Sequence, residues 1–141
     1  MSKVDKGDIL LSMIGTVGVI SFVMEDIVDY AIKNVGLFKT SNTKELQYFT
    51  LTYLKTTKIT NHINMCLAGS TQKYISLTEL RKIPFPLFKD DEISRYNSVV
   101  EPIFSEIKSL NNENSNLTML RDSLLSKLMS GEIDLSEVEY K

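Results

Sequence analysis

Hydrophobic and polar positions in the first forty residues follow a pattern that predicts three β-strands. Residues 8–13 (DILLSM) and 18–24 (GVISFVM) are rich in Ile, Val, Leu and Phe, and the intervening IGTVG supplies two glycines for a turn. Residues 30–39 (YAIKNVGLFK) predict a third strand, in which Gly36 is typical of a bulge. We therefore expect a small β-sheet in the N-terminal part of the chain.

After residue 40 the spacing of apolar residues changes to that of a helix. The stretch SNTKELQYFTLTYLKTT predicts a helix, and Asn42 followed by Glu45 fits an N-terminal capping box. The expected inward face of this helix consists of Leu46, Phe49, Thr50, Tyr53 and Leu54. The next stretch, KITNHINMCLAG, continues helically, and Gly69 is a typical helix stop.

The following segment, GSTQKYISLTELRKIPFPLF, predicts three different structures in succession. STQKY predicts a polar loop, and Ser76 followed by Glu79 fits a second capping box that opens the short turn LTELR. Pro84 and Pro86 cannot donate backbone hydrogen bonds, so KIPFPL is expected to be extended, as an edge strand or the exit from a strand.

From Asp91 to Met129 the pattern predicts one long helix, roughly 55–60 Å in length at 1.5 Å per residue. Its apolar residues recur at alternating steps of three and four, provided that Asn114 and Arg121 fill two gaps. A lone helix with so narrow a seam is unstable in water, so we expect a partner helix. The residues expected to form this partner-binding seam are Ile93, Tyr96, Val100, Ile103, Ile107, Leu110, Asn114, Leu117, Leu124 and Leu128.

These elements predict an α+β protein: a small mixed β/α domain followed by a long coiled-coil-forming α-helix. We divide the chain into a domain over residues 1–90, the helix over 91–130 and an acidic tail over 131–141. Pro102 predicts a kink or a restart of the helix, because it leaves one carbonyl without its usual donor. Gly131 is expected to end the helix.

Composition adds a division of charge to this picture. The chain has 141 residues and a net charge of −2. Residues 1–90 hold 11 Lys or Arg against 8 Asp or Glu, whereas residues 91–141 hold 5 against 10. A basic globular part joined to an acidic helix is typical of a protein with two different partners, although a chance fluctuation explains it equally well.

The sequence also indicates where the protein resides. Apolar runs are too short for a membrane span, and the N-terminal MSKVDKGD is too short and polar for a signal peptide. The single cysteine, Cys66, agrees with a reducing compartment. We therefore expect a cytoplasmic protein without a membrane partner.

Candidate catalytic groups are few. His62 and Cys66 share a helical face, but the chain has no other His or Cys, so packing explains them better than a metal site or a nucleophile–base pair. The GTVG turn lacks the remaining residues of a phosphate-binding loop. Asp90, Asp91 and Glu92 suit the start of a helix. We therefore predict no catalytic residue, no metal and no cofactor.

The polar loop is a better candidate for binding. Ser70, Thr71, Gln72 and Lys73 offer hydroxyl, amide and ammonium groups, which suit contacts to DNA phosphates and base edges, and Lys82 adds to a basic background. The alternative is that this is only a hydrophilic loop that caps a helix.

Taken in order, five stretches resemble the specificity subunit of type I restriction-modification enzymes. They are GDILLSMIGTVGVI, YAIKNVGLFK, ELQYFTLTYL, AGSTQKYISLTELRKIPFPL and a long helix that ends LRDSLLSKLMSGEI. The most specific features are the GSTQ…IS…L..I..P.P run and the LR..LL..L..GEI helix end. The chain resembles the C-terminal part of one target-recognition domain with its spacer helix.

The resemblance implies a non-catalytic subunit that recognises part of a bipartite site in double-stranded DNA. It also implies that long helices pair antiparallel and dock the methyltransferase (modification) subunit, which carries out the chemistry. From the seam we expect two copies of this chain to pair their helices antiparallel as a homodimer, because symmetric pairing is the usual outcome. Two alternatives remain: a truncated interaction or dimerisation module that has lost DNA binding, and a small enzyme for which the chain offers no residue set.

Overall fold

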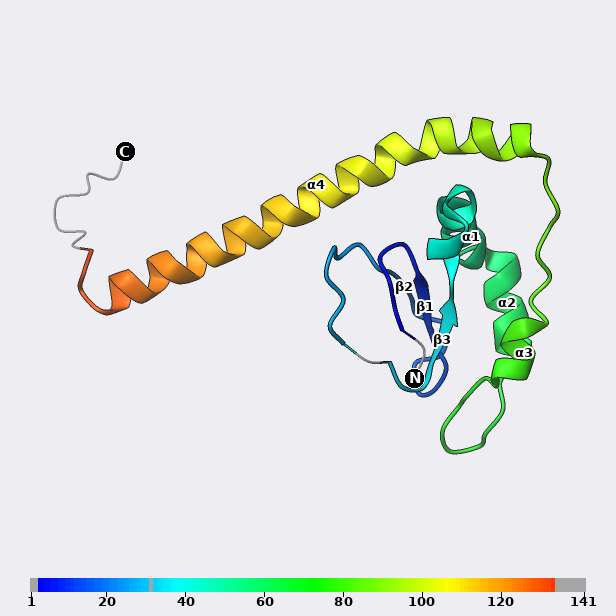
Figure 1. The fold of residues 1–141 in the computed structure, drawn as a ribbon. Coiled ribbons are helices and arrows are strands. Elements are labelled where there is room, and N and C mark those ends of the chain that lie inside the picture. The colour runs from blue at the N-terminus through cyan, green and yellow to red at the C-terminus, as the bar shows by residue number, and fades with distance from the viewer. Residues whose placement is uncertain (1–2, 31, 134–141) are drawn as a thin grey trace. The chain divides into compact units, whose positions relative to one another are not determined.

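The computed structural model describes residues 3–30 and 32–133 of the chain, whose course is shown in Figure 1. The chain divides into two compact units, Met1–Glu101 and Pro102–Lys141, and each is described by itself. We call the first unit the head. The architecture is α+β, as the sequence predicts, because a small antiparallel sheet and short helices precede one long helix. Whether residues 1–90, 91–130 and 131–141 act as separate functional domains stays a prediction.

The sheet has three antiparallel strands in the order β2-β1-β3. Strand β1 (Ile9–Ser12) is central and pairs with β2 (Ile20–Phe22) and β3 (Val35–Phe38), so the predicted strands are confirmed, with shorter bounds. Ile9 and Leu11 are completely buried, as the alternation along β1 requires.

Gly36 is not a bulge, because it pairs in regular register with Leu11. Its role is to make room for α3: a Cβ at this position would lie 2.6 Å from Cδ1 of Leu80. The glycine therefore allows a helix to pack closely on the strand, which is the second common reason for glycine in a sheet.

The first predicted helix starts later than the sequence suggests. Two 3₁₀ turns, Thr40–Asn42 and Lys44–Leu46, precede α1 (Gln47–Leu54). The capping box expected at Asn42 does not form, since no side chain caps either turn. The buried residues of α1 are Thr50, Leu51 and Leu54, so Leu51 takes a place that the sequence pattern gave to Phe49 and Tyr53.

Helix α2 (Thr57–Met65) buries Ile59 and Ile63 against the core. It ends at Met65 rather than at Gly69, because the backbone of Ala68 leaves the helix to pair with Tyr74. The most deeply buried side chains of the head, each less than 2% exposed, come from β1, α1, α2 and the segments between elements. They are Asp8, Ile9, Leu11, Val23, Leu51, Leu54, Ile59 and Ile75. Figure 1 shows α2 and α3 beside β3. Helix α1 contacts β2, where the rings of Tyr48 and Phe22 lie 5.9 Å apart.

Helix α3 (Leu77–Arg81) begins as predicted, with the Ser76 hydroxyl accepting a hydrogen bond from the Glu79 N–H at 3.1 Å. The segment after it does not form a strand, so the expectation of an edge strand there is wrong. Aromatic packing replaces ladder hydrogen bonds there. The Phe88 ring lies 4.3 Å from that of Phe49, and the Tyr53 hydroxyl donates to the Pro84 carbonyl at 2.5 Å.

Helix α4 runs from Asp90 to Met129, within one residue of the predicted bounds. Its first turns belong to the head: Ile93 is 8% exposed, and Tyr96 shares a 2.6 Å hydrogen bond with the Thr52 hydroxyl. The helix continues through Pro102 without a restart, and the boundary between the two units falls at this residue.

The C-terminal end of α4 is closed at Gly131, as predicted. Gly131, with a φ of 74°, donates its N–H to the Leu128 carbonyl, and Glu132 donates to Lys127. These two bonds form a Schellman motif, which satisfies carbonyls that a helix end otherwise leaves unpaired. Most of the predicted acidic tail, residues 134–141, lies outside the described residues. Among the described helices, none combines the length and the apolar composition that crossing a bilayer requires.

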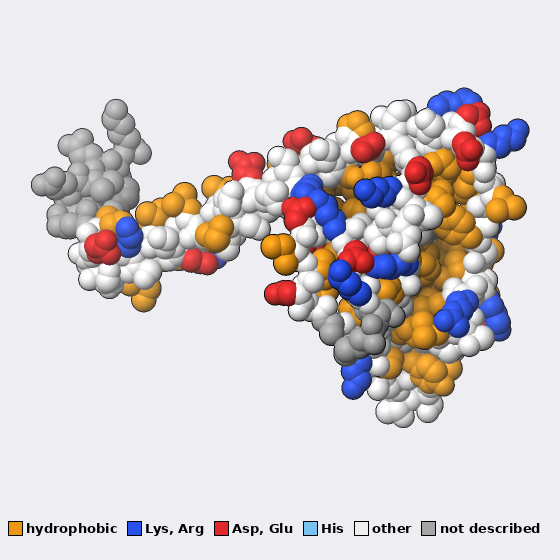
Figure 2. All heavy atoms as spheres, in the orientation of Figure 1, with side chains coloured by type: hydrophobic (Ala, Val, Ile, Leu, Met, Phe, Trp, Pro, Cys, Tyr) orange, Lys and Arg blue, Asp and Glu red, His pale blue; other side chains and the backbone are white. Residues whose placement is uncertain are grey.

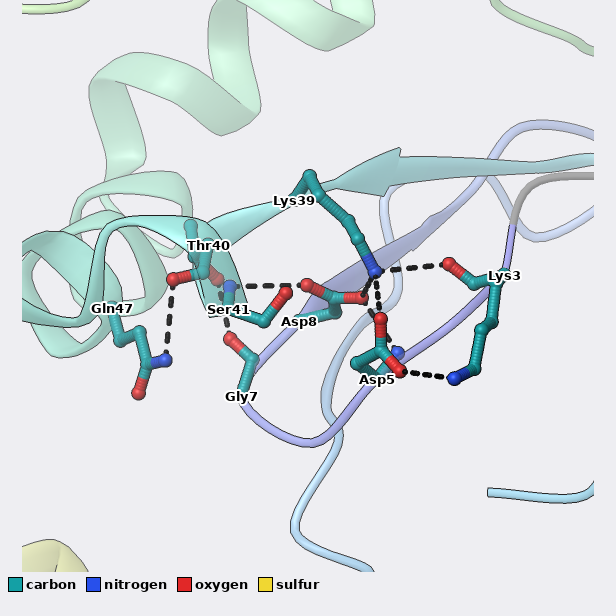
Figure 3. A network of polar contacts seen from close by, with 8 residues as sticks. All are labelled: Lys3, Asp5, Gly7, Asp8, Lys39, Thr40, Ser41 and Gln47. Carbon is teal, nitrogen blue, oxygen red and sulfur yellow. Dashed lines mark hydrogen bonds and ion pairs between the residues drawn. The ribbon is translucent and has the colours of Figure 1, made fainter. Parts of the chain in front are cut away.

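A polar network fixes the N-terminal segment to the end of β3 (Figure 3). The side chain of Asp8 is completely buried and accepts hydrogen bonds from Lys39 Nζ at 2.8 Å, from the Asp5 N–H at 2.8 Å and from the Ser41 N–H at 3.1 Å. Lys39 also reaches Asp5 at 2.6 Å. The network therefore joins residues more than thirty positions apart in the chain.

The charges in this network shift one another's pKa values. Burial acts to raise the pKa of Asp8, but the Lys39 ammonium and the backbone donors outweigh it, so the pKa lies below its ordinary value. Hydrogen bonds to Asp5 and then Asp8 raise the pKa of Lys39. Both groups are therefore held in their charged forms at neutral pH.

Candidate nucleic-acid interface

The predicted DNA-binding loop, Gly69–Lys73, is closed by backbone pairing at both ends. Ala68 and Tyr74 exchange two hydrogen bonds of 2.9 Å. Gly69 has a φ of 93°, and a Cβ there would lie 2.2 Å from the Gln72 carbonyl oxygen. Glycine is therefore required both by the backbone conformation and by the close approach of the chain to itself.

The same loop is attached to the connection between β1 and β2, residues 13–19. The N–H of Gly15 donates to the Lys73 carbonyl at 3.1 Å, and the N–H of Ile75 donates to Met13 at 2.9 Å. An isolated bridge pairs Ile14 with Tyr74. Two turns far apart in sequence thus share one end of the head, and Figure 1 places the loop after α2 at the opposite end from the start of α4.

Four predicted DNA-binding residues lie together on this loop: Ser70, Thr71, Gln72 and Lys73. All four are exposed. Within the described part of the chain, none of their side chains forms a hydrogen bond or an ion pair. The backbone is therefore fixed while the polar side chains stay available to a ligand.

Lys82, the fifth predicted residue, is not brought to the loop. It lies at the C-terminal end of α3, whereas the loop precedes the N-terminal end. Its ammonium group contacts Glu79 Oε1 at 2.7 Å, which raises the pKa of Lys82 and lowers that of Glu79. Lys82 thus stays charged, but the neighbouring carboxylate neutralises part of its field.

Two exposed apolar residues that the sequence analysis did not single out lie beside the loop. Ile14 and Tyr74, which pair through an isolated bridge, are 40% and 45% exposed. An apolar contact to a thymine methyl group is a common mode of base reading. The glycine-bounded IGTVG turn was visible in the sequence, but its position beside Lys73 depends on pairing that no local pattern specifies.

On the face drawn in Figure 2, Lys and Arg side chains form separate groups, and Asp and Glu side chains lie among them. Cys66 Sγ lies 3.8 Å from His62 Nε2, and the described residues contain no cluster of three or more His, Cys, Asp or Glu that could hold a metal ion.

Two of the predicted seam residues, Val100 and Leu128, are half-buried, and the others fall into two sets. Ile93 and Tyr96 contact their own head, as described above. In the second unit, Ile103, Ile107, Leu110, Leu117 and Leu124 are 38–55% exposed, and Leu120 and Leu125 beside them are 56% and 48% exposed. Asn114 is also exposed. Helix α4 beyond residue 102 thus carries an apolar stripe that the described chain does not cover.

Comparison with known proteins identifies the family. A family model described as "Type I restriction modification DNA specificity domain" matches residues 2–119, which is most of the chain. The search of curated proteins found no match. The matched range includes the sheet, the 69–73 loop and the larger part of α4. The chain therefore belongs to the type I restriction-modification DNA specificity domain family.

Proposed function

We propose that this chain recognises part of a bipartite double-stranded DNA site, and that α4 pairs with a second copy and docks the methyltransferase subunit of the same system. Family membership gives the chain a DNA-specificity role in restriction-modification. In this proposal the chain itself has no catalytic activity and needs no cofactor. Its place in the cell, the cytoplasm, stays a prediction.

The observation that carries the DNA proposal is the architecture of the 69–73 loop. Its backbone is fixed at Ala68, Lys73 and Tyr74, whereas its polar side chains are unengaged. A fixed backbone lowers the entropy lost on binding, so each contact contributes more of its energy to affinity. Gln72 suits the edge of adenine, and Lys73 suits guanine or a phosphate.

The helix proposal rests on the exposed apolar stripe between Ile103 and Leu128. Antiparallel pairing of two copies would bury this stripe and place one head at each end of the pair, and closed two-fold symmetry is the usual outcome for identical chains. The methyltransferase subunit would then contact the paired helices.

A second candidate function is an interaction module that no longer binds DNA. The separation of the basic groups on the face drawn in Figure 2 and the pairing of Lys82 with Glu79 favour it. It predicts self-association through α4 without salt-sensitive binding to DNA.

Fluorescence anisotropy with a pool of duplexes tests the two candidates. We expect affinity to fall steeply with salt, because phosphate contacts release counterions. Lys73→Ala should weaken binding to every duplex and reduce the salt slope by about one, whereas Gln72→Ala should relax sequence preference by about 1–3 kcal/mol. Lys82→Ala should weaken binding less than Lys73→Ala.

Lys44→Ala is the matched control, since Lys44 lies on a 3₁₀ turn outside the loop and should leave the titration unchanged. If the wild-type chain shows no salt-sensitive DNA association, the proposed DNA role of this chain is wrong. Light scattering then decides whether it acts as an interaction module.

A further inference from the structure

A second concave surface of the head has a different chemical character from the loop. This groove, of about 870 Å³, lies between the second 3₁₀ turn, the segment 85–88 and the first turns of α4. All of its lining residues belong to the head. We call it the linker groove.

Residues 85–88 form an apolar edge of the linker groove, and two of its aromatic rings pack against Phe49. Leu87 is 100% exposed, and Phe85 and Phe88 are 43% and 37% exposed. The Phe85 ring is fixed by edge contacts with Phe49 at 5.7 Å and Tyr53 at 5.6 Å. Such apolar groups in contiguous exposure mark interaction sites on soluble proteins.

Two prolines limit the motion of this edge. Pro84 and Pro86 each fix φ near −65° on either side of Phe85, so little backbone freedom is left to lose when a ligand binds. The Tyr53 hydroxyl holds the Pro84 carbonyl as well. A segment this constrained, with a leucine wholly in solvent, is suited to presenting that leucine to a partner.

The rim of the groove is acidic. Glu45, Asp90 and Glu101 line it, and Lys and Arg are absent from the described residues that do so. In the wall, Asn97 donates to the Glu45 carbonyl at 2.8 Å, while its own buried Oδ1 finds no donor in the described chain. Negative charge excludes DNA phosphates from this surface and favours a basic ligand.

We infer that the linker groove binds a protein segment that carries large apolar side chains flanked by Lys or Arg. This chain supplies no good match: residues 102–129 hold three basic and three acidic side chains, and residues 134–141 hold three acidic against one basic. The inference rests on the proposed function for the source of the segment, which is the methyltransferase subunit.

Binding of that purified methyltransferase subunit to the full chain, measured by biolayer interferometry, tests the inference. We expect Leu87→Lys to weaken binding at least tenfold, because it removes the apolar contact and repels a basic segment. The triple variant Glu45→Gln, Asp90→Asn, Glu101→Gln should weaken binding at low salt and match the wild type at high salt, where charges are screened. Ile27→Lys, at an 83% exposed apolar residue outside the groove, is the control and should bind normally.

Circular dichroism on each variant confirms that the fold is intact, and DNA anisotropy and light scattering on the same samples report on the proposed function separately. Wild-type chain that fails to bind the methyltransferase subunit, or Leu87→Lys that binds it normally, overturns the inference even if DNA binding is retained. It is also overturned if Leu87→Lys lowers DNA affinity or changes the mass of the dimer, since the groove would then serve those contacts.

Discussion

At the scale of single residues, Asp8 shows how one carboxylate organises the head. Its oxygens collect an ammonium group and two backbone N–H groups from segments that β1 and β3 bring together. A buried carboxylate is tolerated only when such partners replace water. The GD dipeptide after Lys6 is therefore a structural requirement of the fold, not a candidate acid.

Replacing this residue, Asp8→Asn, should destabilise the protein by about 2–4 kcal/mol at pH 7, since buried donors lose their charged acceptor. Because the folded pKa of Asp8 lies below the ordinary 3.8, its contribution is present above that pH and is lost as the pH falls through the folded value. The stability of the variant should thus depend less on pH below about pH 4. Urea unfolding between pH 2 and 7 measures both effects.

Asp122→Asn is the control for this comparison, because Asp122 forms a surface ion pair with Arg121 and is 59% exposed. This substitution should change the free energy of unfolding by no more than about 0.5 kcal/mol. Equal losses for the two variants would show that the buried network adds nothing beyond a surface pair.

At the scale of elements, the sequence predicted what local patterns control. The three strands, the Ser76 cap, the polar loop and the bounds of α4 follow from alternation, capping chemistry and a Gly131 stop. The errors have a common origin in contacts between distant segments. Ala68 pairs with Tyr74 instead of continuing α2. Phe85 and Phe88 pack against Phe49, and their segment does not join a sheet.

The candidate site divides in the same way. Residues 70–73 were found because loop composition reveals polar chemistry directly. Lys82 is placed at the far end of α3, whereas the proximity of Ile14 to the loop depends on tertiary pairing. Closeness in sequence therefore did not show that the basic side chain of Lys82 lies on the loop.

Asn114 tests whether α4 pairs through the predicted seam. In that pairing Asn114→Leu should stabilise the helix pair by about 1.5–3 kcal/mol for each leucine buried, while loosening register or stoichiometry. Asn112→Leu, two residues away and off the seam, is the control and should change neither. Thermal unfolding followed by circular dichroism and the mass from light scattering provide the readouts, and identical behaviour of the two variants would argue against the seam.

At the scale of the whole molecule, one helix connects the two proposed binding surfaces, the DNA-binding loop of the head and the apolar stripe of α4. The first turns of α4 belong to the head, and the exposed apolar stripe lies on the part of α4 that belongs to the second unit. If two copies pair, each DNA duplex meets two heads at once, so the phosphate contacts of both contribute to one binding event.

Breaking the seam should therefore alter DNA binding without touching the loop. We expect the double variant Ile107→Lys, Leu117→Lys to be monomeric in light scattering at tens of micromolar. Its salt slope for a long duplex should fall to roughly half of the wild-type value, because the slope counts phosphate contacts. A wild-type chain that is itself monomeric at this concentration would contradict the pairing.

The closure of the loop by Ala68 and Tyr74 also bears on how such a chain can acquire new targets. The bonds that hold the loop come from main-chain atoms, which every substitution at positions 70–73 leaves in place. The residues at these four positions can be substituted one at a time without changing the hydrophobic core. Natural drift, or a small combinatorial library, would then be able to retune base preference on an unchanged scaffold.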